Sequence, residues 1–240
     1  MFAKRLLSAV LLLSLAGGYA AGQGGRADAR ELVRRGNERY ARAEYEAAIR
    51  EYGRVPAESG EAYAQSLYNL GVCYYELWRT EEAIVMYRRA VAAAAGGRYP
   101  KASYALGVAL EDLNRLPEAK EAYRQAISAS RGRHAPALFR TGLIAAREHD
   151  YETAATLFRR ANARSENHFP NSHNNLGVML ALEGRLAEAV MEFELALRQA
   201  GGDFDEAAHN LSLCRTMLAG GAKTRLASLR IVEATATPVE

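Results

Sequence analysis

The sequence predicts an all-α fold of five helix-turn-helix repeats followed by a capping helix. Three periodic features predict it. Glycines recur at spacings of 35, 36, 35 and 35 residues, at Gly36, Gly71, Gly107, Gly142 and Gly177. An alanine stands twelve residues after each glycine, and a tyrosine or phenylalanine stands sixteen residues after it. A period of this length indicates stacked helical hairpins, each of which covers the apolar face of its neighbour.

The composition agrees with a folded domain of this size. The 240 residues are 49% hydrophobic and 25% charged, with 2 cysteines. These values exclude a disordered chain, a collagen-like chain and a disulfide framework. The net charge is +3, and without Lys4 and Arg5 the basic and acidic residues nearly balance. A nucleic-acid-binding protein usually shows a clustered basic excess, so nucleic acid is not expected as a partner.

Residues 1–20 have the pattern of a secretory signal peptide. Lys4 and Arg5 precede an apolar run over residues 6–16, and Gly18 and Ala20 supply small residues before a cut after Ala20. The alternative is an uncleaved N-terminal anchor, but eleven apolar residues are fewer than the ~20 that span a bilayer. The sequence therefore predicts export to the periplasm or the exterior, with no stable membrane span after cleavage.

Within each repeat, two apolar stripes at helical spacing predict a pair of helices. Leu70 and Tyr74 lie on the face of the first helix, and Ala83, Tyr87 and Ala90 lie on the face of the second. Small residues at the glycine and alanine positions let the two backbones approach closely, and the aromatic ring fills the space beside them.

The same offsets set the expected organisation of the chain. The helical array is expected over residues 29–218, and the tail over residues 219–240 is expected to be flexible. A lone capping helix is expected over residues 205–218, because Asn210-Leu211-Ser212 stands 35 residues after Asn175-Leu176-Gly177. The expected repeats cover about residues 29–56, 64–97, 100–131, 135–164 and 170–200.

These motifs resemble the tetratricopeptide repeat (TPR) family. The resemblance rests on Leu70-Gly71 with Tyr74, Ala83 and Tyr87, and it returns in the later repeats. Two departures are that the units run 35 or 36 residues instead of 34, and that Arg35 replaces the usual leucine in the first unit. The 35-residue period also suggests a pentatricopeptide array, but the Leu-Gly pair and the Ala-Tyr-Ala spacing fit the TPR pattern better.

The resemblance implies a right-handed α-solenoid whose first helices line a concave groove that binds a protein or peptide. Carried over residue by residue, the candidate partner groove contains an aromatic row, an aliphatic row and polar side chains. The alternative is that the rings pack between adjacent repeats. The candidate residues are Asn37, Tyr68, Asn69, Val72, Tyr104, Val108, Phe139, Arg140, Leu143 and Asn175.

No motif in the sequence predicts an enzyme, a cofactor or a metal site. The chain has no Gly-x-Ser-x-Gly, no His-Glu-x-x-His and no phosphate-binding glycine loop. Cys73 and Cys214 lie four repeats apart, too far for a disulfide, and are expected to be small buried side chains. A clamp for a terminal carboxylate is disfavoured, because Val33 and Ala105 stand where the resemblance requires basic residues.

The sequence thus predicts an exported, non-catalytic scaffold or adaptor that binds a protein or peptide of unknown identity. The alternative is a small-molecule or lipid-binding accessory subunit of an envelope transport system. An open groove with exposed polar side chains favours the peptide, whereas a closed apolar cavity favours the small ligand.

Overall fold

The structure is a computed structural model, and it describes residues 28–165, 168–220 and 223–234. The expected signal peptide, residues 1–20, lies outside the described residues. The chain divides into two compact parts, one up to Ala102 and one from Ser103, and each is described by itself.

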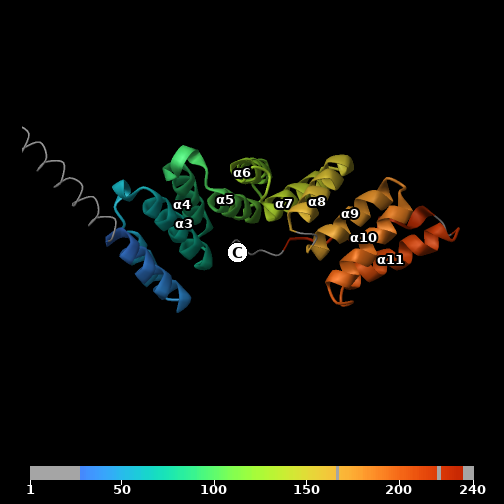
Figure 1. The fold of residues 1–240 in the computed structure, drawn as a ribbon, viewed down its shortest axis with the longest axis horizontal. Helices are drawn as coiled ribbons and strands as arrows, with labels where there is room; N and C mark the ends of the chain where they lie inside the picture. The colour runs from blue at the N-terminus through green and yellow to red at the C-terminus, as the bar shows by residue number, and fades with distance from the viewer. Residues whose placement is uncertain (1–27, 166–167, 221–222, 235–240) are drawn as a thin grey trace, which may run out of the picture. The chain divides into compact units, whose positions relative to one another are not determined.

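The regular structure of the described residues is entirely helical, without a strand, so the all-α prediction is confirmed (Figure 1). Short 3-10 turns are present at Ala57–Ser59, Ala95–Gly97 and Lys223–Ser228. The helices cover residues 28–41, α2 (Tyr45–Tyr52), α3 (Glu61–Glu76), α4 (Thr80–Ala93), α5 (Pro100–Asp112), α6 (Leu116–Ala129), α7 (Ala135–Arg147), α8 (Tyr151–Arg164), α9 (Pro170–Leu182), α10 (Leu186–Gln199) and α11 (Asp205–Leu218).

Consecutive helices pack as hairpins. In the first part α3 packs on α4, and in the second part α7 packs on α8 and α9 on α10. Successive hairpins also contact each other, since α8 packs on α9 and α10 on α11. The capping helix α11 therefore covers the last hairpin, as the sequence predicts (Figure 1).

The glycine of each first helix lies directly against the aromatic ring of the second helix. A Cβ atom built on Gly107 would lie 2.5 Å from Cδ1 of Tyr123, and one on Gly177 would lie 2.6 Å from Cε1 of Phe193. Both rings are fully buried. The two helices can approach this closely only because the glycine has no side chain, which explains why glycine returns at each repeat of the chain.

The helix boundaries follow from local backbone chemistry. Proline stands in the first turn of α6, α7 and α9, where the missing N–H costs little. At the other end, a residue in the left-handed region follows the first helix of a hairpin. Its φ is +60° at Trp78, and the next N–H, of Arg79, donates to the Tyr74 carbonyl at 2.9 Å. This is the Schellman pattern, which satisfies carbonyls that the helix end leaves free.

Candidate functional site

The aliphatic row of the predicted groove lies in the core of the hairpins. Val72, Val108 and Leu143 are buried, and Leu143 belongs to an apolar cluster shared by the helices of the second part. These three side chains therefore support packing.

Each ring of the aromatic row packs against another ring of its own part. The ring centroid of Tyr68 lies 5.5 Å from that of Tyr99, and the centroid of Phe139 lies 4.8 Å from that of Phe169. Tyr104 lies 4.9 Å from the His134 ring and stays partly exposed. These contacts support the alternative given above, in which the rings pack inside the protein and do not bind a ligand.

The partner rings, those of Tyr99, His134 and Phe169, are not among the predicted site residues. Each stands at or just before the start of a first helix, and together they make a further periodic position, 35 residues apart. A search of the sequence for aromatic residues at the repeat period finds them, and it also finds Phe204. The four residues are Tyr99, His134, Phe169 and Phe204.

Arg140 is bound to an acidic residue inside the second part. Its side chain is only 5% exposed, and Nη1 lies 3.0 Å from Oε2 of Glu111. Nε donates to the Tyr104 hydroxyl at 3.2 Å, and the Tyr123 hydroxyl donates to Glu111 at 2.7 Å. Burial raises the pKa of the Tyr123 phenol, so it remains a donor to the carboxylate. Arg140 thus stabilises a buried charged group.

In the first part, the two predicted asparagines contact each other. Nδ2 of Asn69 donates to Oδ1 of Asn37 at 3.1 Å, and the Tyr52 hydroxyl donates to the same oxygen at 2.7 Å. Asn69 is partly exposed and Asn37 is exposed. These amides face the surface of their own part.

Asn175 belongs to a cluster of three asparagines that binds an extended segment of the chain. Its Oδ1 accepts from the Val232 N–H and its Nδ2 donates to the Val232 carbonyl, both at 2.8 Å. Asn210 binds Arg230 in the same two-way manner, with both distances 2.9 Å. Asn174 donates to the Arg230 carbonyl at 3.0 Å. We call Asn174, Asn175 and Asn210 the asparagine site.

The segment that occupies this site is part of the predicted tail. Residues 229–234 follow the last 3-10 turn without helix or strand and return past α9 (Figure 1). Residues 230 and 232 both turn their backbone groups to the asparagine site, as alternate residues of an extended chain do. Oε2 of Glu233 lies 2.5 Å from Nη2 of Arg147, and Leu229 and Ala234 pack against the apolar cluster. Residues 235–240 of the expected tail lie outside the described residues.

The repeat sets the register of this contact. Asn175 and Asn210 are 35 residues apart and occupy the same position in α9 and α11, two residues before Gly177 and Ser212. They bind residues 232 and 230, which are two apart and so lie on one side of an extended chain. A step of one repeat along the helices therefore corresponds to a step of two residues along the bound segment. Asn174 and Asn210 are not among the predicted site residues, although Asn210 stands 35 residues after Asn175.

A pocket of about 500 Å³ lies where the bound segment reaches Ala234. Three aromatic residues, Tyr104, Phe139 and Phe169, line it, and Arg140 is also a lining residue. The remaining lining residues are Ala135, Pro136, Ser165, His168, Asn171 and Ala234.

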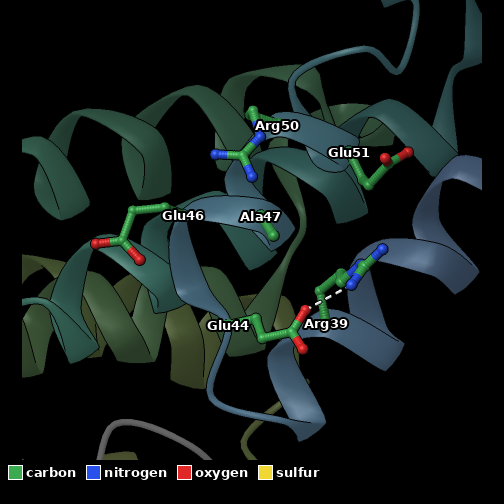
Figure 2. Close-up of a pocket in the computed structure, with 6 residues that line it drawn as sticks. All are labelled: Arg39, Glu44, Glu46, Ala47, Arg50 and Glu51. Atoms are coloured by element: carbon green, nitrogen blue, oxygen red, sulfur yellow. Dashed lines mark hydrogen bonds and ion pairs between the residues drawn. The ribbon is translucent and has the colours of Figure 1, made fainter.

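Surface pockets are also present among the described residues of the first part. One, of about 450 Å³, is lined mainly by charged side chains near the turn before α2, where Arg39 and Glu44 form an ion pair at 2.7 Å (Figure 2). The other, of about 630 Å³, lies between the start of α3 and the end of α4. Neither holds a segment of the described chain.

No group of three or more His, Cys, Asp or Glu side chains among the described residues could hold a metal ion. In the same residues, no helix is long and apolar enough to cross a membrane.

The helical hairpins and their repeat match a known family. A profile described as tetratricopeptide repeat matches residues 26–98 and 104–168. The chain belongs to the tetratricopeptide repeat family. TPR proteins are typically non-catalytic scaffolds that bind proteins or peptides, and no catalytic family matches this chain. Among curated proteins, no sequence matches it.

Three solved structures illustrate the shared fold. MamA is 22% identical, with a TM-score of 0.59 over 69% of this chain and 94% of MamA. YrrB, described as a TPR protein with an unusual peptide-binding site, is 21% identical, with a TM-score of 0.59 over 80% of this chain and 95% of YrrB. TTC0263 of Thermus thermophilus is 23% identical, with a TM-score of 0.51 over 78% of this chain and 98% of TTC0263. At these identities the likeness supports the fold alone.

Proposed function

We propose that this TPR protein is an exported scaffold that binds extended peptide segments of partner proteins at the asparagine site. The proposal covers the side of α7, α9 and α11 that presents Asn174, Asn175, Asn210 and Arg147 to residues 229–234. No catalytic step is assigned to the chain.

One observation carries the proposal. Asn175 and Asn210 each pair with both the N–H and the carbonyl of a single residue in an extended chain. A side-chain amide can donate and accept at once, so it can replace the neighbouring strand that an extended backbone otherwise needs. Recognition through the backbone supplies affinity for many sequences, and side-chain contacts then supply preference.

The small-ligand alternative has weaker support. It requires an enclosed apolar cavity around the aromatic row, but Tyr68 and Phe139 pack against rings of the adjacent hairpin. The 500 Å³ pocket has a suitable volume for a small ligand, yet Ala234 of the bound segment is one of its lining residues. We therefore assign this pocket to the peptide site.

Selection from a peptide library tests the proposed function. Peptides displayed on phage are selected on the immobilised full chain and then measured against Asn175→Ala/Asn210→Ala. We expect the selected peptides to lose at least about tenfold in affinity for this variant, since two two-way amide contacts are removed. Asn69→Ala is the matched control, because Asn69 has the same position in α3 but contacts Asn37. Equal binding to all three proteins would overturn the site.

Export is proposed from residues 1–20 and is tested separately. We expect the mature protein in the periplasm or medium, with an N-terminus at or near Ala21 by mass spectrometry. Recovery of the full-length chain from the cytoplasmic fraction would contradict this part of the proposal.

A further inference from the structure

We propose that residues 229–234 are a resident and displaceable occupant of the asparagine site. The displacing peptide carries a large apolar side chain at the position of Ala234. This inference rests on the proposed function and names the kind of peptide that the site accepts.

The segment is bound mainly through its backbone. The contacts to Asn174, Asn175 and Asn210 all involve N–H or carbonyl groups of residues 230 and 232. The side chains of Arg230, Ile231 and Glu233 remain largely outside these contacts, apart from the ion pair of Glu233 with Arg147. Because so little of the contact depends on side chains, a different extended sequence can make the same hydrogen bonds.

Exchange of one segment for another preserves the polar pairing of the site. The three asparagines are fully buried beneath residues 229–234. An incoming backbone offers the same donors and acceptors, so no buried amide loses its partner after the exchange. The outcome then depends on side-chain burial and on concentration.

The resident segment buries few apolar side chains. Leu229 and Ala234 are only partly buried against the apolar cluster, and Ile231 is 37% exposed. The segment is instead favoured by its covalent attachment to α11, because a tethered ligand has an effective concentration in the millimolar range.

The pocket beside Ala234 gives a competitor its advantage. Ala234 lines a pocket of about 500 Å³, and the residues that line it with Ala234 include Tyr104, Phe139 and Phe169. A phenylalanine at this position can bury its ring there, and full burial of such a side chain corresponds to about tenfold or more in affinity.

The test uses a fluorescent peptide with the sequence of residues 226–234, LASLRIVEA, and its Ala234→Phe form. Binding is measured by anisotropy to the full chain and to Arg230→Pro/Val232→Pro. Proline removes the N–H groups that donate to Asn210 and Asn175, so the tail is released while the helices are unchanged. Ile231→Pro is the matched control, because it leaves both of those N–H groups in place.

We expect the double variant to bind the natural peptide at least about tenfold more tightly than the full chain or Ile231→Pro does. We expect the Ala234→Phe peptide to bind the double variant about tenfold more tightly than the natural peptide. Equal affinity of the full chain and the double variant would overturn the resident role, and equal affinity of the two peptides would overturn the pocket assignment. In either case, library peptides that still require Asn175 and Asn210 would leave the proposed function standing.

Hydrogen exchange on the natural chain gives a second measurement, and this one does not depend on whether the proline variants fold. The amides of Arg230 and Val232 should be protected in the free protein and lose protection with excess Ala234→Phe peptide. Unchanged protection at saturating peptide would overturn displacement. A dimer formed by exchange of tails, detected by light scattering, would overturn occupation within one chain.

Discussion

At the scale of single residues, each repeat position has one steric or polar requirement, and the neighbouring helix determines it. Gly107 lies against the ring of Tyr123 because a second helix covers it. Ser212 holds the same position in α11 and is exposed, and no α-helix follows α11 in the described chain. The loss of the glycine at this position therefore coincides with the loss of the covering helix.

Gly107→Ala tests this requirement. In an open helix the change stabilises by up to about 1 kcal/mol, because alanine has the higher helix propensity. Here the new Cβ would lie 2.5 Å from Cδ1 of the buried Tyr123 ring, and we expect a destabilisation of about 1–3 kcal/mol. Urea denaturation measures it, with Ser212→Ala as the exposed control, which should be neutral or slightly stabilising. A Gly107→Ala protein as stable as the natural chain would contradict the packing role.

The two cysteines test burial in each part separately. Burial raises the pKa of the Cys73 thiol to about 12 and that of Cys214 to about 11. Only the thiolate reacts rapidly, so both should resist alkylation at pH 8 in the native protein and react quickly in urea. The folded state holds these protons more tightly than the unfolded state, in which the thiol pKa is about 9. Stability should therefore fall as pH rises above about 9, which thermal unfolding between about pH 8 and 10 can measure. Rapid native alkylation of either residue would show that its helix face is open.

At the scale of helices and turns, the sequence predicts much of the fold because the signals are local. Periods of three and four residues locate both helices of each hairpin, and Pro117 marks the start of α6. The sequence does not predict which residue takes the left-handed conformation, because Trp78 and His149 stand where glycine is usual. The hairpin geometry imposes that conformation against the residue's own preference.

Trp78→Gly should stabilise the first part. Trp78 has a φ of +60° and is 91% exposed, so its replacement loses little packing and relieves a left-handed conformation that costs about 1–2 kcal/mol. Added backbone freedom in the unfolded chain offsets part of this, and we expect a net gain of about 0.5 kcal/mol. Gly184→Ala, with a φ of +81°, is the inverse change in the second part and should destabilise. Thermal melting of both variants checks the signs, and a loss of stability in Trp78→Gly would show that the ring has an unrecognised contact.

At the scale of the whole molecule, the contacts that sequence reasoning misses are those that do not follow the repeat. Arg140 has the position of Asn175 in its own repeat, but it pairs with Glu111, 29 residues earlier. Residues 229–234 carry no periodic pattern, so their contact with the asparagine site depends on the completed fold. The repeat identifies positions that can bind, whereas the actual partner of each depends on tertiary neighbours.

One charged network joins these non-periodic contacts. Glu111 accepts from Arg140 and from Arg147, and Arg147 also pairs with Glu233 of the resident segment. Glu111 and Arg140 are largely buried, whereas Glu233 is exposed. The buried pair therefore stabilises the second part, and Arg147 links it to the peptide site.

A double-mutant cycle tests this division of roles. Arg140→Met leaves the Glu111 carboxylate with Arg147 as its remaining cation, and we expect a destabilisation of about 3 kcal/mol. Glu111→Gln should cost a similar amount, and the double variant should cost clearly less than the sum, since neither charge is then left buried alone. Arg185→Ala, which breaks an exposed pair with Glu188, should change stability far less. Additive effects of the single changes at Arg140 and Glu111 would contradict their pairing. If Arg140→Met instead kept its stability and lost only peptide binding, Arg140 would be a ligand-binding residue.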